Sequence, residues 1–434
     1  MVEFKKERCF SKMTFAEKLR NHPLYKFPDF RNFFIGDVLV AIAERYFAIT
    51  FAWWLISQDG DNGKWLGILM AVEALPILFL SPFVGPLIDR YNKKKSMLMG
   101  VLMQLFFVSI ICYLLYMDKL PFAMLCLLSF LMSCFVPQFE DSVSASVSRL
   151  VDEEHLSAAT AIQSSSIEFS NIFAAVISTS VIAAFSVLTA VYVNIGLYIV
   201  GAIFLYLIKT DLSPGEKPED HEGDYIKELK EGVRYILGNK AMISYSLIYA
   251  FETFLIVPIF ILIPMLVKNV LNETVNWVAV FEIALSIGAV SMALLMSFRE
   301  RYRNFYNKYA TGIFLIGLSM LGLAFILNEY IMAVIIFLVG ALFAALMALS
   351  FMMFQHVVPD DLKGRFFGII STIAAGMAPL SYMYVGFMSD VLSIEAVLVI
   401  NGLGALLLAG VILVVPRLKQ HIGYDEVEDE GIRG

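Results

Sequence analysis

Acidic side chains inside apolar segments are the residues of this sequence most capable of chemistry. Eight carboxylates and one cation interrupt otherwise apolar stretches: Asp37, Glu44, Arg45, Glu73, Glu140, Asp141, Glu168, Glu252 and Glu282. One cation cannot neutralise so many carboxylates in a low-dielectric interior. We therefore expect some of them to be protonated, to line water or to meet a cationic substrate. A carboxylate of this kind can exchange a proton for a cation without any cofactor.

The spacing of these residues suggests partners. Asp37 and Glu44 are seven residues apart and share one face of a helix. Arg45 is rotated by about 100° from Glu44, so the two do not face each other. The expected partner of Arg45 is an acid on another span. Arg45 can take part in transport or form a structural ion pair that fixes the helix register. The three candidate partners are Glu73, Asp141 and Glu168. Glu44 and Glu252 are predicted to be the central proton- or cation-binding pair, with Glu168 third.

The elements that position these residues must be membrane spans. The chain has 434 residues, of which 59% are apolar and 16% charged, whereas soluble domains carry about 25% charged residues. Spans of about 20 apolar residues cross a bilayer. Twelve such spans are expected, near 31–57, 65–88, 96–117, 121–146, 157–182, 185–208, 241–267, 275–298, 307–327, 330–354, 365–389 and 393–415.

The predicted fold class is an all-α membrane protein with twelve transmembrane helices in two six-helix halves. A polar segment near the middle of the chain separates the halves. The predicted divisions are an N-terminal tail (1–30), the first half (31–208), a linker (209–240), the second half (241–415) and an acidic tail (416–434). An even number of spans places both termini on one side of the membrane.

Lys and Arg residues predict which side that is. With the N-terminus in the cytoplasm, only Lys64, Lys119 and Lys268 of the 32 basic residues lie outside, and Arg45 is embedded. Cytoplasmic loops carry an excess of Lys and Arg, so both termini are predicted to be cytoplasmic in a multi-pass protein of the cell membrane.

The sequence argues against several other functions. No basic domain or nucleic-acid-binding module is present, and the four cysteines form no CxxC pair. No phosphate-binding loop and no nucleophile–base arrangement is visible. We therefore expect no enzyme activity, no cofactor, no metal and no nucleic-acid partner.

The two halves show a faint internal repeat. Glu44 in the first span corresponds to Glu252 in the seventh, and Glu73 in the second corresponds to Glu282 in the eighth. Repeats of this kind place the substrate site at their interface near the middle of the membrane.

The loop after the second span carries a recognisable motif. Gly85 precedes Asp89-Arg90, and a cluster of lysines follows at 93–95. In this position the pattern resembles the loop between helices two and three of the major facilitator superfamily. The resemblance implies that this loop clamps the two halves at the cytoplasmic face. Gly85, Asp89 and Arg90 would contact the start of span eleven near Gly364 and Arg365.

Other stretches resemble one branch of that superfamily, which contains macrolide-efflux and enterobactin-exporter-like proteins. They are Arg31-Asn32-Phe33, Ala43-Glu44-Arg45, the linker segment 231–235, the loop 358–368 and Pro379. Span five lacks the Gly-Pro-rich motif of many drug/proton antiporters, which weakens the case for antiport.

The resemblance and the acids together predict a monomeric secondary transporter, surrounded by membrane lipids, that expels lipophilic or cationic small molecules in exchange for protons. One alternative is an exporter or flippase of a specific solute, such as a siderophore or a lysophospholipid. A second alternative is a membrane receptor or scaffold that does not transport.

Overall fold

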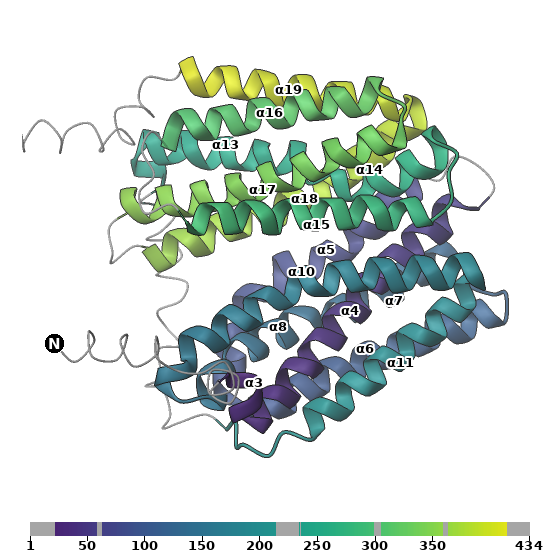
Figure 1. The fold of residues 1–434 in the computed structure, drawn as a ribbon, viewed down its shortest axis with the longest axis vertical. Helices are drawn as coiled ribbons and strands as arrows, with labels where there is room; N and C mark the ends of the chain where they lie inside the picture. The colour runs from purple at the N-terminus through teal and green to yellow at the C-terminus, as the bar shows by residue number, and fades with distance from the viewer. Residues whose placement is uncertain are drawn as a thin grey trace, which may run out of the picture.

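The computed structural model describes residues 22–58, 63–213, 234, 236–298, 305–358 and 363–414. These residues are almost entirely helical, and they contain twelve helical segments long and apolar enough to cross a membrane (Figure 1). The predicted N-terminal tail, most of the linker and the acidic tail lie outside the described residues.

The helices follow the predicted spans closely. Before residue 213 they are α3 (Pro23–Lys26), α4 (Pro28–Ile56), α5 (Gly63–Arg90), α6 (Lys93–Tyr116), α7 (Phe122–Ser133), α8 (Val136–Ser144), α9 (Val147–Leu150), α10 (Glu153–Ala184) and α11 (Val187–Tyr206). After residue 239 they are α13 (Lys240–Ile256), α14 (Ile259–Met265), the π-helix η1 (Leu266–Val270), α15 (Asn276–Ser297), α16 (Phe305–Phe325), α17 (Glu329–Val357), α18 (Lys363–Val391) and α19 (Ile394–Val414).

Two spans are broken near prolines. The seventh span divides between α13 and α14 at Val257-Pro258, because proline removes a backbone donor and disfavours helix in the residue before it. The fourth span divides between α7 and α8, and Pro137 lies in the first turn of α8. Only two residues separate the fifth and sixth spans, since α10 ends at Ala184 and α11 begins at Val187.

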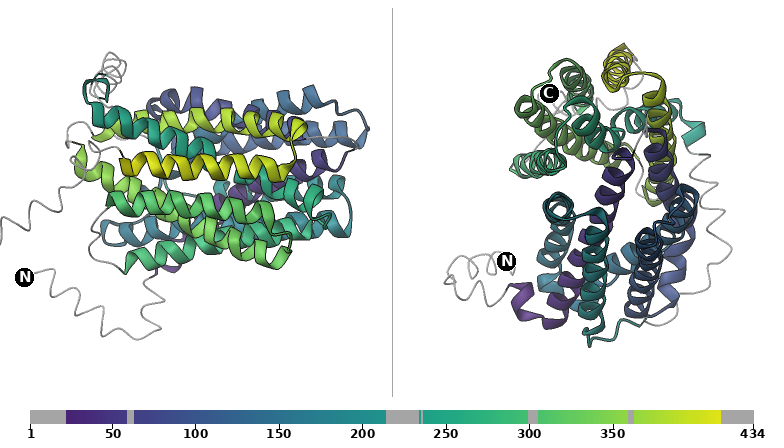
Figure 2. Two further views of the ribbon diagram at one scale, coloured as in Figure 1. Left: turned by 90° about the horizontal axis from the view of Figure 1, so that it is seen from above. Right: turned by 90° about the vertical axis from the view of Figure 1, so that its right-hand side faces the viewer.

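The helices pack as two groups. The first helix group contains α3 to α11, and the second contains α13 to α19 (Figure 1). The main contacts between the groups join α5 to α18 and α10 to α15, with smaller contacts from α14 to α4 and α5. Figure 2 shows the long helices running in roughly one direction, with the groups side by side in the end-on view. The faces between the groups are therefore supplied by α4, α5, α10, α14, α15 and α18.

We call the end of the bundle where α4 begins end A and the end where α4 finishes end B. The groups meet at end B and diverge toward end A (Figure 1). At end B the backbones of α5 and α18 touch, and a Cβ atom on Gly67 would lie 2.7 Å from the Cα of Gly386. The backbone N–H of Lys64 donates to Asp390 Oδ1 at 3.1 Å. End B is thus closed by backbone contact that only glycine permits.

At end A the segment after α11 is bound to the first helix group. The Asp29 carboxylate accepts from the backbone N–H of Thr210 at 2.7 Å, and Lys94 Nζ donates to the carbonyl of Ile208 at 2.6 Å. Hydrogen bonds from the side chain and backbone N–H of Ser213 hold the pKa of Asp211 below its ordinary value. The first residues of the predicted linker are therefore anchored to the first group.

Candidate functional site

An ion pair joins the two helix groups near the middle of α4. Arg45 lies near the middle of α4, and its Nη2 is 2.5 Å from Glu282 Oε2 on α15. The Glu282 side chain is 5% exposed and that of Arg45 22%. The prediction that Arg45 pairs with Glu73, Asp141 or Glu168 is wrong, because the docking of the two groups brings the Glu282 side chain of α15 within reach of Arg45 on α4.

Other helices surround Arg45. Its guanidinium carbon lies 5.4 Å from the centre of the Phe260 ring on α14, within the range of a cation–π interaction. Glu168 on α10 and Tyr382 on α18 lie within electrostatic reach. Arg45 Nε is buried and has no hydrogen-bond partner among the described residues. The one cation of this central cluster therefore makes its short contact with Glu282 alone.

Glu73 on α5 lies beside this cluster. Tyr382 is within electrostatic reach of Arg45, Glu282 and Glu73, so the tyrosine is a neighbour that the ion pair and the second acid share. Glu73 Oε1 is buried and finds no hydrogen-bond partner in the described part of the chain. Ser129 on α7 is its polar neighbour.

Glu44 faces the interior of the first helix group. Its polar neighbours are Gln104 on α6 and Tyr198 on α11, which are both fully buried. Glu44 Oε1, both amide atoms of Gln104 and the Tyr198 hydroxyl are buried, and none has a hydrogen-bond partner within the described residues. Within the described part of the chain, Glu44 therefore has polar neighbours but no cation to balance a charge.

Three further acids lead from Glu44 toward end A. Asp37 is buried on the same face of α4 as Glu44, seven residues earlier in the chain. It accepts a hydrogen bond from Ser166 Oγ at 3.1 Å. Glu140 on α8 is exposed and lies within electrostatic reach of both Asp37 and Glu44. Asp141 is half-buried beside it. These acids form a series from an exposed carboxyl to a buried one.

Glu252 lies in a separate environment inside the second helix group. The Tyr309 hydroxyl of α16 donates a short hydrogen bond to Glu252 Oε2. The Tyr245 ring lies 6.0 Å from the ring of Tyr309. The structure does not bring Glu44 and Glu252 together, as the sequence interpretation expected, because each turns toward the interior of its own group.

Several site residues carried no signal in the sequence. Tyr382, Phe260, Gln104, Tyr198 and Tyr309 are aromatic or amide residues in apolar helices, where ordinary packing is the usual interpretation of their type. Their place near the acids depends on which helix faces which. Of these, Gln104 was the most detectable, as an amide in the middle of an apolar span.

The predicted gating residues are only partly described. The backbones of Gly85, Asp89 and Arg90 lie in the last turns of α5, and those of Gly364 and Arg365 in the first turn of α18. Their side chains lie outside the described residues, so the contact between Asp89 and α18 stays a prediction.

The described residues contain no group of three or more His, Cys, Asp or Glu side chains able to hold a metal ion. The acids of the site are spread over α4, α5, α8, α10 and α15 rather than gathered about one point. Their arrangement suits proton transfer and the binding of an organic cation.

Curated relatives cover most of the chain. An uncharacterised MFS-type transporter, YfiS, from Bacillus subtilis is 24% identical over 83% of this chain and 86% of its own. Macrolide efflux protein A from Streptococcus pyogenes is 19% identical over 86% of this chain and 92% of its own. The staphyloferrin A transporter of Staphylococcus aureus is 21% identical over 84% of this chain and 90% of its own.

The fold is also that of solved transporters. The nucleoside transporter NupG, crystallised as a point mutant, superposes with a TM-score of 0.74 at 11% identity, over 89% of this chain and 99% of its own. A sequence model described as Major Facilitator Superfamily matches residues 33–382. With this match, its twelve apolar helices and its fold, the chain belongs to the Major Facilitator Superfamily and is a transporter rather than an enzyme.

Proposed function

We propose that this transporter uses a proton gradient to expel lipophilic cations by alternating access. Efflux relatives support the direction of transport, since macrolide efflux protein A covers most of the chain. The family itself speaks against the alternative of a receptor or scaffold that does not transport.

The observation that carries the proposal is the charge balance at the centre. Arg45 is engaged by Glu282, while Glu44 and Glu73 each keep a buried carboxylate oxygen without a hydrogen-bond partner among the described residues. A buried carboxylate without a partner is costly as an anion. A proton or a bound cation removes that cost, and the two compete for the same oxygen. Such competition couples proton entry to cation exit.

We assign different roles to the two acids. Glu73 lies beside Tyr382 at the boundary between the helix groups, where a substrate can meet both groups. Glu44 ends the series that begins at the exposed Glu140, which suits proton delivery. Asp37 and Asp141 belong to the same series, and Glu168 adds negative charge near Arg45. Glu252 is assigned a structural role inside the second group.

The orientation follows from the distribution of Lys and Arg. With the N-terminus in the cytoplasm, end A faces the cytoplasm and end B the outside. The groups diverge at end A (Figure 1), so we assign the structure to the inward-open state. In that state the site would receive substrate from the cytoplasm or the inner leaflet. We further propose that the protein works as a monomer in the cell membrane, with the divisions at 31, 209 and 241 as its domain boundaries.

A second candidate function is export of one specific solute, such as a siderophore. The staphyloferrin A transporter among the relatives favours it, and Arg45 could bind one carboxylate of such a solute. A lysophospholipid is a further possibility of the same kind. A lipophilic cation would compete with a proton for the Glu73 carboxylate, whereas an anionic solute would compete with Glu282 for Arg45.

The test uses sealed proteoliposomes, an imposed proton gradient and a fluorescent lipophilic cation. Wild-type protein should move the dye only with the gradient, and Glu73→Gln should abolish this movement. Glu395→Gln is the matched control, because Glu395 lies in the first turn of α19 away from the site. Gradient-driven dye movement that survives in Glu73→Gln would contradict the role of Glu73. No dye movement by wild-type protein, with gradient-driven uptake of a ferric siderophore instead, would favour the second function.

A further inference from the structure

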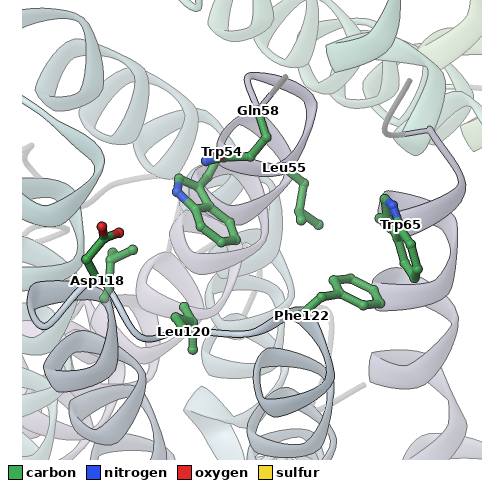
Figure 3. Close-up of a pocket in the computed structure, with 8 residues that line it drawn as sticks. Trp54, Leu55, Gln58, Trp65, Asp118, Leu120 and Phe122 are labelled. Carbon is green, nitrogen blue, oxygen red and sulfur yellow. The ribbon is translucent and has the colours of Figure 1, made fainter. Parts of the chain in front are cut away.

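A cavity of about 310 Å³ opens in the first helix group at end B, away from the central acids (Figure 3). The end of α4, the start of α5, the end of α6 and the loop that leads into α7 surround it. Its lining residues are Trp54, Leu55, Gln58, Trp65, Leu115, Asp118, Leu120 and Phe122. The volume is at the lower end of the range found for small-molecule pockets.

Aromatic rings form much of the wall. The rings of Trp65 and Phe122 pack with centroids 4.6 Å apart, and Trp54 contributes its indole from α4 on another side (Figure 3). Aromatic faces attract cations through the ring quadrupole, and tryptophan does so most strongly. Walls of this kind hold alkylated ammonium groups, whose methyl or ethyl groups also bury apolar surface.

Asp118 is the one charged residue in the described part of the lining. Asp118 follows the C-cap of α6 with φ 53, in the left-handed region. The N–H of Asp118 donates to the carbonyl of Leu115 and the N–H of Lys119 to that of Leu114. This pattern is a Schellman motif, in which the residue at the Asp118 position is usually glycine. Aspartate at a position suited to glycine places a carboxylate at the cavity at some conformational cost.

The neighbouring lysines do not line the cavity. Lys64 Nζ lies 5.5 Å from the centre of the Trp65 ring and 5.2 Å from that of Phe387 on α18, and the Lys64 backbone binds Asp390. Lys119 is exposed on the loop and is not part of the wall. Among the residues that the structure describes, the lining therefore combines aromatic faces with a single negative charge and no positive one.

We infer that this cavity binds an alkylated ammonium group, held by the aromatic walls and neutralised by Asp118. Two sources present this chemistry at a membrane surface: a free organic cation and the headgroup of a choline lipid. The inference does not depend on the proposed transport cycle, because the cavity lies apart from Arg45, Glu73 and Glu282.

The test measures binding of radiolabelled tetraethylammonium to full-length protein in phosphatidylglycerol nanodiscs. The Glu73→Gln background removes any contribution of the central site. In that background Asp118→Gly should weaken binding about tenfold, the size of a strong cation–π or ion-pair contribution. Thermal stability should be unchanged or higher, since glycine suits the left-handed backbone. Trp65→Leu should weaken binding by a similar factor.

Asn272→Gly is the matched control. Asn272 has φ 54, so glycine relieves the same backbone conformation there without removing a carboxylate from this cavity. It should leave tetraethylammonium binding unchanged. Equal affinity in the Glu73→Gln protein with and without Asp118→Gly, or equal loss in Asn272→Gly, would overturn the inference.

A second arm identifies the source. The same measurement in phosphatidylcholine nanodiscs should show weaker tetraethylammonium binding if the choline headgroup occupies the cavity, and Asp118→Gly should remove this dependence on lipid. Equal affinity in both lipids, with the Asp118 dependence retained, identifies a free cation as the ligand. A lipid effect that is the same in wild-type and Asp118→Gly protein, with no Asp118 dependence in either lipid, would overturn the inference.

Discussion

Glu44 and Glu252 are the two acids that the sequence repeat predicts to occupy related positions, yet their surroundings differ. Glu252 accepts a hydrogen bond from Tyr309 and is 5% exposed. Glu44 keeps a buried oxygen that no described side chain binds, although Gln104 and Tyr198 are near. Of these two acids, only Glu252 therefore has a fixed hydrogen-bond donor among the described residues. A carboxylate with a fixed donor is suited to structure, and one without is free to take up and release a proton.

The same asymmetry appears at two other pairs of related positions. Glu282 binds Arg45, whereas its counterpart Glu73 has no comparable ion pair within the described residues. Asn194, the eighth residue of α11, donates to the carbonyl of Ala43 at 2.7 Å. Asn401, the eighth residue of α19, is fully buried, and neither of its amide atoms has a hydrogen-bond partner in the described structure.

The largest expected effect separates Glu282 from Glu73. Glu282→Gln leaves the Arg45 guanidinium without its anion, and we expect a loss of about 3 kcal/mol in the free energy of unfolding. Glu73→Gln removes a carboxylate that has no cation and should leave stability unchanged or higher. Equilibrium unfolding in mixed detergent micelles measures both. Equal losses of unfolding free energy in the two variants would contradict the proposed difference between Glu282 and Glu73.

The next effect concerns transport by the Glu44 and Glu252 variants. Glu44→Gln should lower the gradient-driven rate about 100-fold, as expected when a proton-transfer group is lost. Exchange of labelled for unlabelled substrate without a gradient should continue, because it needs no net proton movement. Glu252→Gln should keep most of the gradient-driven rate. If Glu252→Gln loses coupling and Glu44→Gln does not, the assigned roles are reversed.

A smaller effect is expected at the tyrosines. Tyr309→Phe removes the donor to Glu252 and should cost about 1–2 kcal/mol of unfolding free energy, because the carboxylate is left without that bond. Tyr198→Phe is the matched control. The Tyr198 hydroxyl is buried without a described partner, so its removal should cost little. A comparable loss in Tyr198→Phe would show that Glu44 also has a fixed donor.

The smallest effect distinguishes the two asparagines. Asn194→Leu breaks the bond to Ala43 and should destabilise the protein by about 1 kcal/mol. Asn401→Leu removes buried polar atoms that have no described partner and should be neutral or stabilising. Thermal unfolding of the two variants side by side tests this, and destabilisation by Asn401→Leu would point to a partner for its amide.

The spans were predictable because length and apolar composition determine them. Their ends agree with the helices within a few residues, and Pro258 breaks the seventh span as a helix-interior proline should. The break between α7 and α8 was not foreseen, although Pro137 was its signal.

The partners of the acids were not predictable in the same way. The expectation that Arg45 pairs with an acid on another span is confirmed, but Glu282 was not among the candidates, because the choice depends on how the two helix groups dock. The contact of Tyr309 with Glu252 depends likewise on how the second helix group places α16 relative to α13. Spacing along one helix reports which residues share a face, and says nothing of what another helix places opposite.

The contact between Gly67 and Gly386 also bears on how long the transporter stays in each conformation. At this contact the backbone of α5 packs directly on the backbone of α18, so the two helices can separate without repacking side chains between Gly67 and Gly386. A single methyl group at Gly67 would meet the carbonyl oxygen of Tyr382 at 2.5 Å and hold the helices apart. Gly67→Ala should therefore shorten the dwell time of the sealed state in single-molecule recordings. The absence of a side chain at Gly67 thus helps to determine how long end B stays closed in each transport cycle.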